Sequence, residues 1–136
     1  MPSNRKLHVR VFKNAWFERF ARKQGITDES LLDAIKRAEQ GLIDANLGAG
    51  VIKQRIARSG QGKSGGFRTI ILYRTTERAF FIYGFAKSDR ANITINEEIT
   101  FKKAAGYVLG LSEAHLKDLM NKGHFSEVQN GEKIQE

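Results

Sequence analysis

The residues best suited to chemistry in this 136-residue chain are basic, and they gather between positions 53 and 90. This stretch contains nine Lys and Arg residues against two acids, and it carries +7 of the chain's formal net charge of +8. The nine are Lys53, Arg55, Arg58, Lys63, Arg68, Arg74, Arg78, Lys87 and Arg90. Guanidinium and ammonium groups are the side chains that bind phosphate. The stretch therefore predicts contact with a nucleic-acid backbone.

The expected strands bring two of these cations together at one end of a sheet. Residues 67–75 and 79–87 are rich in β-branched and aromatic side chains, and the three-residue link between them predicts a hairpin. Antiparallel pairing then places Arg68, near the start of the first strand, beside Lys87, at the end of the second. The basic residues that flank the link fall at the other end of the hairpin, so we expect them to matter much less.

Two further cations are expected at the same end of the sheet. Residues 51–58 alternate as a strand does, and Arg58 is the last of them. The segment 59–66 has four glycines, which predicts a flexible connection whose backbone amides can approach a phosphate beside Lys63. Cations that converge in this way repel one another unless an anion lies between them. This repulsion argues against an ordinary solvated surface.

Such a cluster is suited to cutting RNA without a metal ion. The ribose 2′-OH is itself the nucleophile, so the protein has to orient the sugar, exchange a proton and stabilise the charge on the phosphate. An Arg provides a planar fork for the phosphate oxygens, and neighbouring cations lower the pKa of a Lys toward values at which it exchanges protons. DNA lacks the 2′-OH and would be bound but not cut.

Other site chemistries fit the sequence less well, and no metal or cofactor is expected. The chain has no Cys, which excludes disulfides and Cys-ligated zinc or iron–sulfur sites. His8, His115 and His124 fall in three separate elements, and no carboxylate pair in the basic stretch is placed to hold catalytic magnesium. Residues 57–64, ARSGQGKS, fit a loose P-loop pattern, but a strand follows them where a P-loop requires a helix.

The elements that must position the cluster predict an α+β domain. Residues 7–12 alternate as a half-buried strand. Two amphipathic helices follow as a helical hairpin, the first between Asn14 and Gly25 and the second between Thr27 and Gly41. After the sheet the pattern becomes helical again.

The C-terminal part of the chain predicts two more helices. Thr94–Glu97 fits a capping box that opens the first of them, and Ser112 opens a shorter helix that Gly123 ends. We interpret residues 1–136 as a single domain, in which about 124–136 form a partly flexible tail.

Composition limits where the protein acts. The N-terminus has no hydrophobic signal region, and the longest apolar run, residues 79–86, is too short to span a bilayer. The expected location is the cytoplasm, with no membrane partner.

The charge of the chain is arranged in blocks. Residues 1–24 sum to +6 and residues 53–90 to +7, whereas residues 25–52 and 91–136 are mildly acidic.

With these residues in view, the chain resembles the RelE/HigB-type toxins of type II toxin–antitoxin systems. The most specific segments are VFKNAWFERFARKQGI at 11–26, GVIKQRIARSGQGKSGGFRTIILYR at 50–74 and FFIYGFAKSDRANI at 80–93, and the ending from Tyr107 has the same character. The resemblance implies a compact fold in which an N-terminal strand and a helical hairpin pack on a curved antiparallel sheet, with C-terminal helices. It also implies an mRNA endonuclease that acts in the ribosomal A site, where the 16S rRNA is a partner. A cognate antitoxin that neutralises the toxin by binding is implied as well.

The resemblance also suggests residue roles. The family's Arg that opens the central strand corresponds to Arg68, and the basic residue that closes the next strand corresponds to Lys87, with Arg90 just beyond. On this hypothesis Arg68 stabilises the transition state, and Lys87 or Lys63 takes part in proton transfer. The expected contacts to the RNA backbone are Lys53, Arg55, Arg58 and Arg90. The proton donor is left open between Tyr107 and His124.

Two other readings compete with this one. The related ParE-type toxins share the fold but inhibit DNA gyrase without cleaving nucleic acid, although they generally lack the basic cluster after the central hairpin. A plain nucleic-acid-binding module would show salt-sensitive binding and no cleavage.

Overall fold

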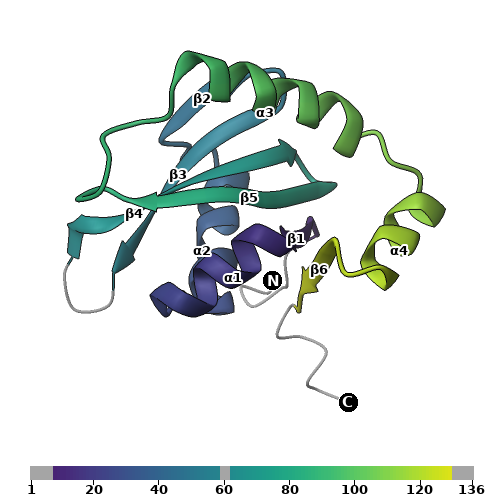
Figure 1. Ribbon diagram of the computed structural model, residues 1–136, viewed down its shortest axis with the longest axis horizontal. Coiled ribbons are helices and arrows are strands. Elements are labelled where there is room, and N and C mark those ends of the chain that lie inside the picture. Colours follow the sequence, from purple (N-terminus) through teal and green to yellow (C-terminus); the bar gives the residue numbers. More distant parts are fainter. Residues whose placement is uncertain (1–7, 59–61, 130–136) are drawn as a thin grey trace.

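The computed structural model describes residues 8–58 and 62–129 as a sheet with helices on both of its faces (Figure 1). The elements in chain order are β1 (Arg10–Asn14), α1 (Ala15–Gln24), α2 (Asp28–Glu39), β2 (Ala45–Gly48), β3 (Val51–Arg58), β4 (Gly62–Arg74), β5 (Arg78–Ala86), α3 (Ile95–Val108), α4 (Glu113–Asn121) and β6 (Phe125–Val128). The α+β class predicted from the sequence is confirmed.

The six strands form one sheet in the order β2-β3-β4-β5-β1-β6. The hairpin predicted between residues 67–75 and 79–87 is confirmed as β4 and β5, which pair antiparallel from Phe67 opposite Ala86 to Arg74 opposite Arg78. One pairing differs from the antiparallel sheet that was expected, because β1 lies beside β5 and runs parallel to it. The sheet is therefore mixed.

Each face of the sheet has its own core. Side chains such as Phe17 and Ile35 from α1 and α2 pack with Ile52 and Phe81 on one face. On the other face, Phe80 and its neighbours pack against α3 and α4. We call these the α1-side and the α3-side of the sheet. β1 was predicted to be buried on one side only; this was wrong, because helices cover both faces at this strand.

The helix ends are fixed by local hydrogen bonds that the sequence predicted. Asn14 caps α1 by accepting from the backbone N–H of Phe17 at 2.7 Å, and Thr27 caps α2 in the same way. Thr94 and Glu97 form the predicted capping box of α3, and Ser112 caps α4. Among the described residues, no helix combines the length and the apolar character that a membrane span requires.

Two predicted boundaries were wrong. The tail expected from about residue 124 includes β6, which pairs antiparallel with β1 through Val128 opposite Val11; residues 130–136 lie outside the described part. The connection expected over 59–66 is also shorter, because β4 already begins at Gly62. The pairing of β4 with β3 extends from Phe67 back through Gly66 to Gly62, which lies opposite Arg58. A Cβ atom at Gly66 would collide with the carbonyl oxygen of Ile56. Glycine allows the backbones to approach this closely.

Candidate nucleic-acid interface

Four cations predicted to bind or cut RNA lie toward one end of the sheet, on its α3-side. Arg55 on β3 pairs with Arg68 on β4, which pairs with Phe85 on β5, and residues paired across a sheet share a face. Lys53 precedes Arg55 by two residues and shares that face. The backbone N–H of Lys87 donates to Gly66 at 3.2 Å, which continues the ladder and puts Lys87 beside Arg68, as predicted. We call Lys53, Arg55, Arg68 and Lys87 the α3-side cluster.

The members of this cluster differ in how far their charge is compensated. Lys53 donates from Nζ to Oδ1 of Asn92 at 3.0 Å, and one guanidinium nitrogen of Arg55 lies 3.4 Å from Oδ1 of Asp44. Within residues 8–58 and 62–129, by contrast, no carboxylate oxygen lies within 4.0 Å of the charged nitrogens of Arg68 or Lys87. These two side chains are therefore the ones best placed to receive an external anion.

At the opposite end of the sheet, the charges of the arginines are compensated by acidic side chains. Its ion pairs are Arg10–Glu113 at 2.7 Å, Arg10–Glu127 at 3.0 Å, Arg78–Glu113 at 3.1 Å and Arg74–Glu77 at 3.6 Å. Arg10, followed by Arg78, lowers the pKa of the Glu113 carboxyl below its ordinary value. Both ends of the β4–β5 hairpin carry arginines, but only those at the turn end have acidic partners in the described structure.

Arg58 does not join the α3-side cluster, so the predicted convergence of four cations on one phosphate is wrong in this respect. Its guanidinium carbon lies 4.8 Å from the centre of the Phe67 ring, which belongs to the opposite face of the sheet. The pairing register also shifts between Ile56 and Arg58. Lys63 lies in the first residues of β4, but its side chain, like residues 59–61, is outside the described part of the chain.

Arg90 is occupied within the protein and does not face solvent as a free cation. Its guanidinium donates to both carboxylate oxygens of Glu97, at 2.6 and 3.2 Å, to the Tyr83 hydroxyl at 2.8 Å and to the Asn92 carbonyl at 3.1 Å. It also lies over the rings of Tyr83 and Phe85. Arg90 therefore joins the segment after β5 to the first turn of α3.

The Arg90–Glu97 pair predicts a pH dependence of stability. Arg90, followed by the backbone N–H of Thr94, lowers the pKa of Glu97 from 4.5 to about 2. A carboxyl whose pKa is lower in the folded chain stabilises the fold at pH above about 4.5, and this contribution is lost as the pH falls toward 2. We expect Glu97→Gln to lower the melting temperature at pH 7, and the difference from wild type to shrink between pH 4.5 and 2.

Thermal unfolding followed by circular dichroism across this pH range would test the expectation. Glu29→Gln is the matched control, because Glu29 is an exposed acid in the first turn of α2. A difference between wild type and Glu97→Gln that stays constant from pH 7 to pH 2 would show that the ionised carboxylate is not what stabilises this helix start.

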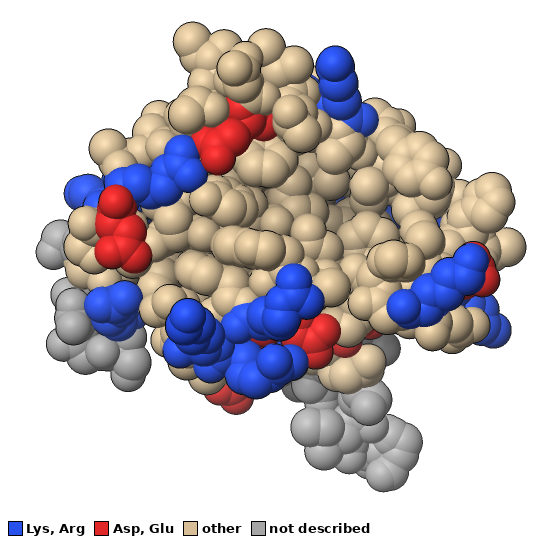
Figure 2. Space-filling view, in the orientation of Figure 1, with Lys and Arg blue, Asp and Glu red and all other residues tan. Residues whose placement is uncertain are grey.

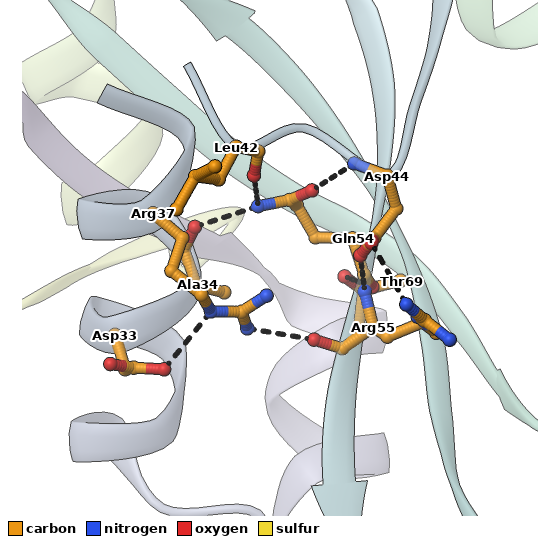
Figure 3. Close-up of polar contacts among 8 residues, drawn as sticks. All are labelled: Asp33, Ala34, Arg37, Leu42, Asp44, Gln54, Arg55 and Thr69. Carbon is orange, nitrogen blue, oxygen red and sulfur yellow. Dashed lines mark hydrogen bonds and ion pairs between the residues drawn. The ribbon is translucent and has the colours of Figure 1, made fainter. Parts of the chain in front are cut away.

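A buried amide holds the part of β3 that carries Arg55 (Figure 3). The Gln54 side chain is fully buried; its Nε2 donates to the carbonyls of Ala34 and Leu42 at 2.9 and 3.2 Å, and its Oε1 accepts from the N–H of Asp44 at 2.7 Å. Asp44 in turn accepts the backbone N–H of Arg55 at 2.7 Å. These bonds connect three parts of the chain: α2, the segment that precedes β2, and the strand β3. We call them the Gln54 network.

The same edge of β3 is closed by a second contact from α2. Arg37 donates from Nη2 to the carbonyl of Arg55 at 2.8 Å and is itself held by Asp33 at 3.2 Å (Figure 3). β2 pairs with β3 only as far as Lys53, so both backbone groups of Arg55 are satisfied by side chains and not by a neighbouring strand. The position of Arg55 therefore depends on Asp44 and Arg37.

Sequence reasoning missed one hydroxyl of this region. Tyr83 pairs with Ile70, so it lies on the α3-side, and Arg90 donates to its hydroxyl oxygen. Of the two groups considered as proton donors, Tyr107 is 68% exposed on α3, and His124 follows α4. Alternation along the strand puts Tyr83, Phe85 and Lys87 on one face, and this pattern is the sequence signal that could have identified Tyr83.

No group of three or more His, Cys, Asp or Glu side chains in the described part of the structure is arranged to hold a metal ion. The α3-side cluster consists of Arg and Lys side chains, which are the kinds that bind phosphate, and a tyrosine hydroxyl lies on the same face.

Comparisons with known proteins bear on the family of the chain. No curated protein matches the chain in sequence. A family model described as the RelE toxin of the RelE / RelB toxin-antitoxin system matches residues 9–128, which include every element of the fold. The chain therefore belongs to the RelE toxin family of toxin–antitoxin systems.

Proposed function

We propose that this toxin is an endoribonuclease that cuts mRNA on the ribosome and thereby inhibits translation in the cytoplasm. The observation that carries the proposal is the contrast between the two ends of the β4–β5 hairpin. The arginines at the turn end are paired with acids, whereas Arg68 and Lys87 have no carboxylate within 4.0 Å in the described structure. Uncompensated neighbouring cations favour a bound phosphate, because they repel each other without one.

In the proposed reaction the ribose 2′-OH attacks the adjacent phosphorus while the bond from phosphorus to the 5′ oxygen of the next nucleotide breaks. The products are a 2′,3′-cyclic phosphate and a 5′-OH. The proton leaves the 2′-OH and a proton reaches the leaving oxygen, so no covalent enzyme intermediate is needed. Arg68 stabilises the charge on the phosphate, and Lys87 or Lys63 exchanges protons. Tyr83 adds a further hydroxyl on the same face.

The partners in this proposal are mRNA in the ribosomal A site, the 16S rRNA around it and a cognate antitoxin. Lys53 and Arg55 hold the RNA backbone beside the scissile phosphate, because they share the face of Arg68. Arg58 and Arg90, which were also expected to contact RNA, have different surroundings, the former on the α1-side and the latter within the protein.

Purified protein, ribosomes and a short mRNA positioned in the A site would test the proposal. We expect cleavage within the A-site codon, and we expect a single 2′-deoxy substitution 5′ of the scissile phosphate to abolish it, because the nucleophile is then missing. Cleavage of the deoxy-substituted mRNA would contradict attack by the 2′-OH. Intact mRNA together with inhibited DNA gyrase would support a ParE-like activity instead.

A further inference from the structure

The side chain of Tyr83 is fixed beside the α3-side cluster by contacts to both its ring and its hydroxyl. The ring stacks on Trp16 of α1, with ring centres 4.8 Å apart, and packs beside Phe101 of α3 at 5.8 Å. Nη1 of Arg90 donates to the hydroxyl oxygen at 2.8 Å. The ring and the hydroxyl therefore have separate supports, and a fixed position is what a group needs for efficient proton transfer.

Arg90 is itself positioned by the start of α3. Its guanidinium donates to both carboxylate oxygens of Glu97, at 2.6 and 3.2 Å, and Glu97 belongs to the capping box that opens this helix. Figure 2 shows Lys and Arg side chains beside acidic ones over the segment that joins β5 to α3. A bidentate contact of this kind fixes the orientation of the guanidinium as well as its position. The first turn of α3 therefore supports the Tyr83 hydroxyl through Arg90.

The direction of the Arg90 hydrogen bond leaves the hydroxyl proton of Tyr83 available. A guanidinium has donors only, so the Tyr83 oxygen accepts in this contact and its own hydrogen points away from Arg90. When the proton leaves, the negative oxygen that remains lies 2.8 Å from a guanidinium nitrogen. This is the geometry of a proton donor whose conjugate base is stabilised by a neighbouring cation.

Tyr83 and Lys87 share the face of Arg68 and lie on either side of it. Arg68 is opposite Phe85 in the β4–β5 ladder. Tyr83 comes two residues before Phe85, and Lys87 comes two residues after it. Diagonal neighbours across two antiparallel strands are about 7–8 Å apart, within reach of long and aromatic side chains. Arg68 is therefore flanked by an amine on one side and by a phenol hydroxyl on the other.

Cleavage by the 2′-OH needs two proton transfers, on opposite sides of the phosphorus. The attacking 2′ oxygen and the departing 5′ oxygen lie roughly in line, with the phosphorus between them. The base that takes the 2′ proton and the acid that protonates the 5′ oxygen must therefore stand on opposite sides of the group that holds the phosphate. Lys87 and Tyr83 have this arrangement around Arg68.

From this arrangement we infer that Tyr83 is the general acid of the cleavage reaction, and that Arg90 and Glu97 are positioning residues that act through it. The inference rests on the proposed function. The O–H bond of Tyr83 breaks as the bond from phosphorus to the 5′ oxygen breaks, and the proton goes to that oxygen. The proton of the 2′-OH goes to the base, a role that the proposed function gives to Lys87 or Lys63. The phenolate beside Arg90 then regains a proton from water.

Two mRNA substrates that differ in one atom would test the role of the Tyr83 hydroxyl. The first has the ordinary linkage, and the second, the 5′-thio mRNA, has sulfur in place of the departing 5′ oxygen in the A-site codon. A thiolate departs without being protonated, whereas an alkoxide needs a proton. We expect Tyr83→Phe to cut the ordinary mRNA about 10²–10⁴-fold more slowly than wild type, and the 5′-thio mRNA at nearly the wild-type rate. A wild-type rate on the ordinary mRNA, or equal losses on both substrates, would overturn the inference.

The same substrates separate positioning from folding for Glu97. Glu97→Gln should show a smaller loss than Tyr83→Phe on the ordinary mRNA and no loss on the 5′-thio mRNA, because only the protonation step depends on the Tyr83 hydroxyl. An equal loss on both substrates would mean that Glu97 supports the fold and does not position the acid.

Tyr73→Phe is the matched control, because Tyr73 lies toward the turn end of β4 and its hydroxyl donates to Glu39. It should cut both substrates at the wild-type rate. Tyr107→Phe and His124→Ala are measured beside it. If either of these, and not Tyr83→Phe, loses cleavage of the ordinary mRNA alone, that residue is the acid and the inference is wrong. Wild-type protein that cuts neither substrate would count against the proposed function, whereas wild-type cleavage without a selective loss in Tyr83→Phe would count only against the assignment of the acid.

Discussion

Replacing Arg68 by alanine is expected to lower the rate of mRNA cleavage by about 10²–10³-fold, the usual cost of removing one well-placed electrostatic donor from a transition state. The side chain is half-buried on the α3-side, between Arg55 on β3 and Phe85 on β5, so its position is set by two neighbouring strands. Cleavage of ribosome-bound mRNA by the purified variant would give the rate. Induction in growing cells should show relief of growth arrest.

Arg74→Ala is the matched control, because Arg74 lies on the same strand as Arg68 at the other end of the hairpin and is exposed beside Glu77. It should retain full activity. Both variants should melt within a few degrees of wild type, since neither change removes a buried apolar side chain. If Arg68→Ala cuts mRNA at the wild-type rate, Arg68 does not act on the transition state and the α3-side cluster is not the cleavage site.

A large loss of stability is expected from Gln54→Leu. The leucine fills a similar volume, but it leaves the N–H of Asp44 and the carbonyls of Ala34 and Leu42 without the partner that they have in the folded protein. Each buried polar group that loses its partner costs on the order of 1–3 kcal/mol, so we expect a loss of about 3 kcal/mol. For a chain of this size that is a fall in melting temperature of about 10 °C. Urea or thermal unfolding would measure it.

Two companion variants separate hydrogen bonding from packing. Gln40→Leu makes the same chemical change at an exposed position and should alter stability little. Gln54→Glu keeps the shape but removes the two donated bonds at neutral pH and buries a charge, so it should be at least as unstable as Gln54→Leu. A Gln54→Leu protein as stable as wild type would show that the Gln54 network is dispensable for the fold.

The sequence predicted most of the helices and the central hairpin because local residues determine them. Each predicted cap, from Asn14 to Ser112, is a side chain that bonds a backbone N–H a few residues away, so its signal lies within one turn. The run of β-branched and aromatic residues in β4 and β5 is long enough to identify strands without knowledge of their partners.

The elements that sequence reasoning missed depend on distant partners. β2 and β6 have four residues each, and a segment this short becomes a strand only because another strand lies beside it. For β6 that strand is β1, at the other end of the chain. The same limit applies to the site: the sequence placed Arg68 beside Lys87, but it gave no sign that Glu97 would engage Arg90.

Arg58 shows how a correct pattern can give a wrong site. Alternation along residues 51–58 already assigns Arg58 to the face of Ile56 and away from Arg55, and the structure has this arrangement. The predicted convergence considered which end of the sheet each cation occupies and not which face. Because the sheet separates its two faces, both the end and the face that a cation occupies must be known to decide whether two cations can hold one phosphate.

The place of β1 in the sheet has a consequence for how the protein is made. β1 lies between β5 and β6, and its Arg10 binds Glu127, which is 117 residues further along the chain. A nascent chain emerging from the ribosome therefore displays β1 long before either strand that flanks it exists. Contacts between such distant segments form late in folding, since their loop must close first. The core around Phe12 is thus completed only after β6, which contributes Phe125 to it, has been synthesised.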